Sequence, residues 1–452
     1  MIHKYKLNGY NIVLDVNSGA VHVVDDLAYE ILDFTDENMS KNLSADVIEK
    51  LSEKYEKSDI LDTYSELYEL YNNGQLYTKD EYEKFASMMV ISPVKSMCLN
   101  ISHDCNLRCE YCFAAKGDFG TGRELMSFDI AKKAIDFLIE KSGNRHLEVD
   151  FFGGEPLMNF DVVKKTVEYA RSIEKEHDKN FRFTITTNGL LLTDDKIDFI
   201  NREMSNVVLS LDGRKEVNDK LRVSPNGSGS YDVIVPKYQK LVAERSDKDY
   251  YVRGTFTKNN LDFTKDIIKM SELGFDQLSI EPVVSDTKLD YSIKKEDLPR
   301  VFEEYETLAK EMIKRKKSGK CFNFFHFMID LDQGPCAIKR LRGCSCGNEY
   351  IAVTPNGDVY PCHQFVGNED FLMGNVFEGL KRTDIRDSFK SCNVYSKEKC
   401  RECFARFYCS GGCAANSYNF HGDIHNTYDI GCALQKKRVE CAIMIKAADA
   451  EI

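Results

Sequence analysis

The stretch His103-Asp104-Cys105-Asn106-Leu107-Arg108-Cys109-Glu110-Tyr111-Cys112-Phe113 directly follows a segment with strand character near residues 97–102. Its three cysteines have the spacing C-x3-C-x2-C. Thiolates at this spacing can bind three irons of a 4Fe–4S cluster and leave the fourth iron open for another molecule. Zinc is the alternative, but a structural zinc site usually takes four ligands, and this stretch lacks a neighbouring fourth. We therefore predict an iron–sulfur cluster on Cys105, Cys109 and Cys112.

The chain around and after this motif alternates between strand and helix patterns. The strand patterns lie near residues 97–102, 147–152, 181–187, 206–211, 250–257 and 277–282, and the helical patterns lie near residues 128–142, 162–176, 195–202, 231–243, 263–273 and 295–316. This alternation predicts an α/β fold with parallel strands and right-handed crossovers. Six such units indicate a partial (β/α)6 barrel of TIM-like type over residues 91–320, with its active site at the C-terminal ends of the strands.

The residues before the barrel predict a small separate module. Ile2–Leu7, Tyr10–Leu14 and Ala20–Val24 are short alternating runs separated by turn signals such as Asn8-Gly9. Helical patterns follow, one of them with a favourable cap at Ser58-Asp59. We expect a β-hairpin-plus-helices domain of winged-helix type over residues 1–90.

Cysteine dominates the residues after the barrel, so we expect a third domain over residues 321–452 that folds around metal. The whole chain of 452 residues contains sixteen cysteines. With 61 basic and 73 acidic residues the net charge is −12, which argues against a nucleic-acid or anionic-membrane partner. No targeting or membrane-spanning segment is evident, so we expect a cytoplasmic protein, where ligand-spaced cysteines bind metal rather than form disulfides.

The cysteine motif and its position after a strand resemble the radical S-adenosylmethionine (SAM) superfamily. The resemblance implies that SAM chelates the open iron and that reductive cleavage of SAM produces a 5′-deoxyadenosyl radical. It also implies SAM contacts at further positions: Tyr111 near the adenine, Gly153, Gly154 and Glu155 of a GGEP motif, and Asn188, Ser210, Asp212 and Arg222 at the barrel rim. Without the cysteine motif, a Gly-Gly pair would indicate only a turn. Arg222 could equally be a solvated surface arginine.

The C-terminal spacing Cys400-x2-Cys403-x5-Cys409-x3-Cys413 closely resembles the SPASM domain, which carries two auxiliary 4Fe–4S clusters. The resemblance assigns the outer cluster to Cys400, Cys403, Cys409 and Cys432, and the inner cluster to Cys344, Cys362 and Cys413. Zinc knuckles are the alternative, since CxxC pairs occur in both. We expect an open iron in the inner cluster, although Cys346 could close it, because a C-x-C pair in an extended segment puts both sulfurs on one side.

The remaining cysteines lie outside these patterns. Buried cysteine is common in protein cores, so we interpret this group as packing residues. The group consists of Cys98, Cys321, Cys336, Cys392 and Cys441.

The chain as a whole is similar to the maturases of six-cysteine (SCIFF) peptides, in the N-terminal module, the barrel and the run from Tyr350 to Phe365. The resemblance implies a thioether-forming, sactipeptide-type synthase that acts on a cysteine-rich ribosomal precursor. The N-terminal module would bind the leader peptide by strand addition. A flavodoxin- or ferredoxin-type protein would donate electrons. The competing hypotheses are a formylglycine-forming dehydrogenase, resembling the sulfatase maturases, and a scaffold without catalytic activity.

Overall fold

The computed structural model describes residues 1–86, 93–331 and 340–450. Its centre is a sheet in which six parallel strands follow the order β10-β9-β8-β7-β6-β4. Their bounds are β4 Ser96–His103, β6 His146–Gly153, β7 Asn180–Thr187, β8 Asn206–Ser210, β9 Asp249–Phe256 and β10 Gln277–Pro282. The six predicted strands and their parallel pairing are confirmed.

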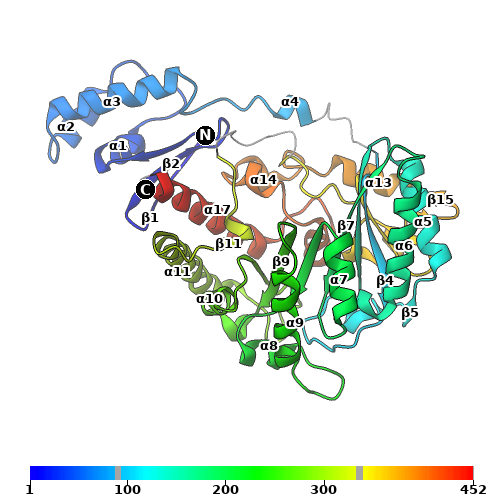
Figure 1. Cartoon of the computed structure of the whole chain (residues 1–452). Coiled ribbons are helices and arrows are strands. Elements are labelled where there is room, and N and C mark those ends of the chain that lie inside the picture. Colours follow the sequence, from blue (N-terminus) through cyan, green and yellow to red (C-terminus); the bar gives the residue numbers. More distant parts are fainter. Residues whose placement is uncertain (87–92, 332–339, 451–452) are drawn as a thin grey trace.

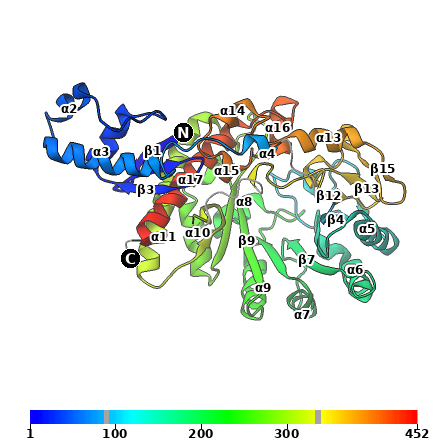
Figure 2. The same ribbon diagram turned by 90° about the horizontal axis from the view of Figure 1, so that it is seen from above.

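Helices between these strands cover the outer face of the curved sheet (Figure 2). They are α5 Phe128–Lys141, α6 Phe160–Ile173, α7 Asp194–Glu203, α9 Tyr231–Ala243 and α10 Thr264–Glu272, with the short α8 Lys215–Leu221 before α9. The helix α11 Leu298–Lys317 follows β10. In β6, Leu147, Val149 and Phe151 alternate with more exposed residues and are fully buried. This period of two packs one face of each strand against the helices.

The sheet does not close on itself. β11, Asn323–Phe324, pairs in parallel with β10 at one edge. At the other edge β12, Tyr350–Val353, pairs in parallel with β4 and leads into three short antiparallel strands: β13 Asp358–Tyr360, β14 Gly374–Asn375 and β15 Gly379–Leu380. The C-terminal region thus begins as a continuation of the barrel sheet, directly beside the strand that precedes Cys105.

The N-terminal residues form an antiparallel sheet of β1 Ile2–Leu7, β2 Tyr10–Asp15 and β3 Val21–Val24, as predicted. Asn8 and Gly9 both have positive φ, 53° and 91°, which is typical of a type I′ hairpin turn. The helices of this region are α1 Asp26–Ile31, α2 Ala45–Leu51, α3 Lys57–Asn72 and α4 Glu83–Ala86. The predicted cap at Ser58-Asp59 is wrong, because α3 begins at Lys57 after Glu56 without a side-chain cap.

A long C-terminal helix, α17 Asp429–Ala450, joins the N-terminal sheet to the rest of the chain (Figure 1). Tyr5 on β1 donates a hydrogen bond to the carbonyl of Glu440 at 2.9 Å, and the His3 ring contacts the Glu440 carboxylate at 3.0 Å. The helix was not predicted, because it is buried on several sides and so shows no single apolar stripe. The remaining C-terminal helices are α13 Thr383–Ser391, α14 Glu398–Arg401, α15 Arg406–Cys409 and α16 Ala414–His421.

Two expectations fall outside the described residues. The proposed boundary after residue 90 lies within residues 87–92, and Cys336 lies within residues 332–339. In the part of the chain that the structure describes, no helix has the length and apolar character required to cross a membrane.

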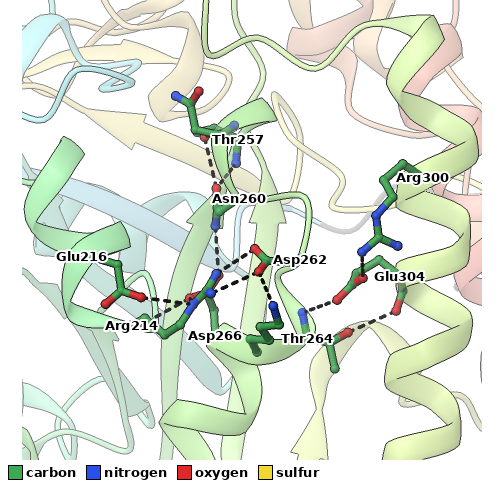
Figure 3. A network of polar contacts seen from close by, with 11 residues as sticks. Arg214, Glu216, Thr257, Asn260, Asp262, Thr264, Asp266, Arg300 and Glu304 are labelled. Carbon is green, nitrogen blue, oxygen red and sulfur yellow. Dashed lines mark hydrogen bonds and ion pairs between the residues drawn. The ribbon is translucent and has the colours of Figure 1, made fainter.

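A buried ion-pair network fixes the loop that follows β8 (Figure 3). Arg214 donates from Nε to Asp266 Oδ1 at 2.7 Å and from Nη2 to Asp262 Oδ1 at 2.7 Å. Asn260 donates to the other oxygen of Asp266 at 3.1 Å. A Cβ on Gly213 would lie 2.2 Å from the Asp266 side chain, so only glycine allows this approach. The network ties the loop after β8 to the loop between β9 and α10.

Replacing Arg214 with Met should lower the free energy of unfolding by about 3 kcal/mol, because Asp266 keeps a buried charge without its main partner. Thermal unfolding of the holoprotein measures this as a lower melting temperature. Arg382→Met is the matched control, since the Arg382–Asp384 pair is solvent-exposed and its loss should leave the melting temperature unchanged. Equal melting temperatures for Arg214→Met and the unmodified protein would contradict the structural role of the network.

Candidate functional site

A cavity of about 550 Å³ opens at the C-terminal ends of the parallel strands. One wall is formed by the loop after β4, with Cys105, Cys109 and Cys112. The opposite wall is formed by the C-terminal region, where Cys413 and residues of α16 and α17 reach the cavity. The barrel and the cysteine-rich region therefore enclose one common space.

The loop that carries the first three cysteines is held by backbone hydrogen bonds to the segment after α8. The amide of Arg108 donates to Val223 at 2.7 Å, and that of Glu110 donates to Leu221 at 3.1 Å. Burial raises the pKa of the Cys105 thiol to about 12 and also raises the pKa of Cys109. Such thiols are poor ligands when protonated, and a bound metal would deprotonate them.

Gly153 and Gly154 bring the end of β6 against the cysteine loop. A Cβ on Gly153 would lie 2.2 Å from the carbonyl oxygen of Ser102, and one on Gly154 would lie 2.2 Å from that of Asp104. Gly153 has a φ of 129°, which L side chains rarely adopt. The two glycines are therefore required by the close approach of two backbones next to Cys105.

Glu155 follows these glycines and lines the cavity, although it is buried. Its carboxylate accepts hydrogen bonds from the amide of Leu157 at 3.0 Å, the hydroxyl of Thr187 at 2.7 Å and the amide of Asn188 at 2.8 Å. Burial raises the pKa of Glu155, and the three donors oppose this shift. Glu155 thus joins the ends of β6 and β7, as well as facing the cavity.

Asn188 and Ser210 lie at the ends of β7 and β8 and line the same cavity. The Asn188 amide nitrogen donates to Asn106 Oδ1 at 2.8 Å and approaches the Cys105 sulfur at 3.6 Å. Asn188 is therefore next to the cysteine loop, whereas Ser210 lies farther along the row of strand ends.

Tyr111, Asp212 and Arg222 form one hydrogen-bonded group. Arg222 Nη1 donates to the Tyr111 hydroxyl at 2.9 Å, and this hydroxyl donates to Asp212 Oδ2 at 2.6 Å. Tyr111 and Arg222 line the cavity, while the fully buried Asp212 lies behind them and accepts from the Thr255 amide. Arg222 is 7% exposed, which excludes the solvated surface arginine considered from the sequence. Within the described residues its Nε has no hydrogen-bond partner.

Four of the C-terminal thiols gather around α14, α15 and the start of α17. Burial and the neighbouring thiols Cys409, Cys432 and Cys403 raise the pKa of Cys400 to about 12. Burial, Cys432 and Cys403 likewise raise the pKa of Cys409 to about 11. These four thiols are the set that the sequence resemblance assigned to the outer cluster.

A second group of thiols includes Cys413, which lines the cavity. Cys346 forms side-chain hydrogen bonds with both Cys344 and Cys362, and its contact lowers the pKa of Cys344 to about 6. Burial raises the pKa of Cys413 to about 11, with smaller contributions from Cys362 and Cys344. Cys346 therefore belongs to the inner group, which contains four thiols rather than the three expected.

The cysteines present fit iron–sulfur clusters. All fifteen described cysteines are free thiols. No three His, Cys, Asp or Glu side chains of the described ranges lie close enough to hold a single metal ion, whereas in a 4Fe–4S cluster each thiolate binds a different iron. The donor chemistry, the grouping and the burial of these thiols thus suit clusters of several irons.

The cysteines outside the groups differ in their surroundings. Cys98 and Cys441 are buried, and Cys392 is partly buried, as expected for packing residues. Cys321 is exposed, so its interpretation as a packing residue is wrong. It lies between α11 and β11, at the end of the exposed run 316–321.

Sequence reasoning missed three charged residues that line the cavity. Arg253 on β9, Glu281 at the end of β10 and Arg438 on α17 all line it. The first two lie near the C-terminal ends of barrel strands, and that position was the available signal. His363, next to Cys362, also lines the cavity, and burial lowers its pKa to about 4.

Two known families match parts of this chain. The Radical SAM superfamily matches residues 99–245. SPASM, an iron–sulfur cluster-binding domain, matches residues 344–404. The first region contains the loop with Cys105, and the second contains Cys344, Cys362 and Cys400.

Two curated relatives and one solved structure are similar to most of this chain. A cysteine-type anaerobic sulfatase-maturating enzyme of Clostridium novyi (strain NT) is 25% identical, over 73% of this chain and 88% of the relative. The radical SAM cyclopropyl synthase TigE of Paramaledivibacter caminithermalis is 24% identical, over 95% of this chain and 91% of its own. The fold resembles native anSMEcpe with bound AdoMet and Cp18Cys peptide, with a TM-score of 0.66 and 21% identity, covering 80% of this chain and 100% of that one.

Proposed function

We propose that this chain forms thioether cross-links in a ribosomally made precursor peptide. The premise is that it belongs to the radical SAM enzymes that carry a SPASM domain. The observation that carries the proposal is the single cavity bordered by Cys105, Cys109 and Cys112 on one side and by Cys413 of the inner group on the other. A peptide in this cavity would have the residue that loses a hydrogen atom near Cys105, Cys109 and Cys112. The peptide's cysteine thiol would lie near Cys413. The similarity to SCIFF maturases supports the choice of a thioether product.

Radical SAM domains bind SAM and one 4Fe–4S cluster, and SPASM domains bind auxiliary clusters. When bound, SAM and its cluster supply abstraction of a hydrogen atom, and an auxiliary cluster supplies an acceptor for one electron. In the proposed product a C–S bond replaces a C–H and an S–H bond. The peptide thereby loses one hydrogen atom, one proton and one electron.

We assign the SAM contacts to residues around the first cysteine set. Tyr111 would lie near the adenine, Gly153, Gly154 and Glu155 near the amino group, Asn188 and Ser210 near the ribose, and Arg222 near the carboxylate. Asp212 would act through Tyr111 rather than by contact, because it does not line the cavity within the described residues. The free Nε of the buried Arg222 supports a carboxylate ligand there.

Replacing Tyr111 with Phe should weaken SAM binding about tenfold, because Arg222 loses its acceptor and Asp212 loses its donor. Equilibrium binding of SAM to the anaerobic holoprotein measures the effect. Tyr169→Phe is the control, since its hydroxyl bonds Asp136 between the outer helices α5 and α6. Unchanged affinity in Tyr111→Phe would remove this group from the SAM site.

We assign the outer auxiliary cluster to Cys400, Cys403, Cys409 and Cys432. The inner cluster would be held by Cys344, Cys346, Cys362 and Cys413. The contacts of Cys346 with two other thiols favour this closed, four-thiolate site over the open site expected from the sequence. The inner cluster would then accept an electron without binding the substrate thiol.

The three-part division of the chain supports distinct roles. We propose that residues 1–90 bind the leader peptide, residues 91–320 carry out the radical chemistry and residues 321–452 hold the auxiliary clusters. β3 is one of the two edge strands of the N-terminal sheet and could accept an added strand. A flavodoxin- or ferredoxin-type protein would supply electrons in the cytoplasm.

The sulfatase-maturating relative keeps formylglycine formation as a second candidate. That alignment covers 73% of this chain, whereas the TigE alignment covers 95%. The similarity that spans nearly the whole chain is therefore to a radical SAM enzyme that is not named as a sulfatase maturase.

Mass spectrometry separates the two reactions. Reconstituted enzyme, SAM and dithionite are incubated with cysteine-containing peptides from a displayed library, and products without a free thiol are isolated. A thioether removes two hydrogens and retains sulfur, whereas formylglycine formed from cysteine loses sulfur. Products that retain sulfur support the proposal, and products without it would replace thioether formation by formylglycine formation.

A further inference from the structure

The part of the cavity lining formed by β9, β10 and α17 contains more positive than negative charge. Nη2 of Arg253 lies 3.4 Å from Oε1 of Glu281, and Nη2 of Arg438 lies 3.8 Å from Oε2. The His326 ring contacts the same carboxylate at 3.0 Å, and burial lowers the pKa of His326, so this ring is neutral near pH 7. Two guanidinium groups, which stay protonated in proteins, therefore share one carboxylate.

Neither arginine has its hydrogen-bonding capacity filled. Arg438 is 6% exposed; its Nε donates to the Tyr305 hydroxyl at 2.8 Å, but its buried Nη2 has no hydrogen-bond partner among residues 1–86, 93–331 and 340–450. The side chain of Arg253 is 54% exposed and lines the cavity. A buried guanidinium without acceptors is costly, and its planar fork suits a carboxylate.

Arg222, which also lines the cavity, has a different balance of charge. The positive charge of Arg222 is balanced by the negative charge of Asp212, and the Tyr111 hydroxyl connects the two side chains. The excess positive charge therefore belongs to Arg253 and Arg438, which share Glu281.

We propose that Arg253 and Arg438 bind a carboxylate of the peptide substrate, supplied by an Asp or Glu side chain near the modified residue. This site rests on the proposed function, because it requires a peptide in the cavity. It would select acidic core sequences and fix the position of the peptide between the two cysteine sets. Glu281 holds the two arginines in place and competes with the substrate carboxylate.

The test uses holoenzyme, SAM, dithionite and a displayed library of peptides with one cysteine and randomised neighbours. Unmodified peptides are removed with a biotinylated iodoacetamide, and peptides that have lost their thiol are sequenced. Asp or Glu should be enriched about tenfold at one distance from the cysteine. Arg253→Gln should abolish the enrichment, Arg253→Lys should retain part of it, and Glu281→Gln should increase it.

Arg253 is the preferred variant, because Arg438 is buried and its replacement could prevent folding. Arg182→Gln is the matched control. The Arg182 side chain, on β7, is also 54% exposed, and it pairs with Asp249, on β9, at 3.7 Å. This control should leave the enrichment unchanged. Opposite effects of Arg253→Gln and Glu281→Gln would not arise from a merely structural role.

Three outcomes would overturn the proposal in distinguishable ways. Modified peptides without acidic enrichment would remove the carboxylate site and leave the peptide chemistry intact. Weaker SAM binding in Arg253→Gln, equal to that in Arg222→Gln, would assign the pair to the SAM carboxylate. Loss of thiol from no peptide at all would contradict the proposed function and this site together.

Discussion

Replacing Cys105, Cys109 and Cys112 together with Ala is expected to abolish SAM cleavage and to remove about four of about twelve irons. The three thiols line one wall of the cavity, and a cluster that lost all of them would have no protein ligands there. Iron content and 5′-deoxyadenosine formation by anaerobically reconstituted, dithionite-reduced protein measure the two effects.

A triple variant of buried or partly buried cysteines outside the ligand groups provides the control. Replacement of Cys98, Cys392 and Cys441 with Ala should leave the iron content of the folded protein unchanged. Thermal unfolding detects any loss of folded protein. Survival of SAM cleavage in the variant that lacks Cys105, Cys109 and Cys112 would end the radical SAM interpretation of this cavity.

Replacing Cys346 with Ala is expected to remove the inner cluster, and with it about four further irons. Cys346 contacts both Cys344 and Cys362, so its loss takes away the thiol that joins two others of the group. SAM cleavage without peptide should persist, since the first cysteine set is untouched. Thioether formation should fall strongly, because the electron released with C–S bond formation loses its nearest acceptor.

Cys441→Ala is the matched control for this variant, because Cys441 is also buried and belongs to neither thiol group. It should retain all the iron and form the same products. Full iron content in Cys346→Ala, together with a spectroscopic change on addition of a cysteine peptide, would instead indicate an inner cluster with an open iron.

The parts of the fold that were predictable are those with local signals. In each barrel unit, apolar residues recur with a period of two in the strand and with a period of about 3.6 in the following helix. All six strands could therefore be identified in the sequence. The spacing around Cys105 and around Cys400 is equally local. α17 was missed because it is buried on several sides, and its burial depends on β1 and α11, which lie far away in the sequence.

The charged wall of the cavity could not be predicted for a related reason. Arg253, Glu281 and Arg438 come from β9, β10 and α17, and each alone is an ordinary charged residue in sequence. Their proposed role depends on an excess of positive charge, two guanidinium groups for one carboxylate. This excess is seen only in the assembled cavity. The same holds for Cys346, whose assignment depended on its contacts rather than on its spacing.

Transfer of deuterium from peptide to 5′-deoxyadenosine tests the central claim most directly. A library-selected cysteine peptide, deuterated at the carbon that becomes linked to sulfur, is incubated with holoenzyme, SAM and dithionite, and the 5′-deoxyadenosine is analysed by mass spectrometry. The account predicts one deuterium in the 5′-deoxyadenosine for each thioether formed. Cleavage of SAM with thioether formation but without deuterium in the 5′-deoxyadenosine would contradict direct hydrogen abstraction from a peptide bound in this cavity.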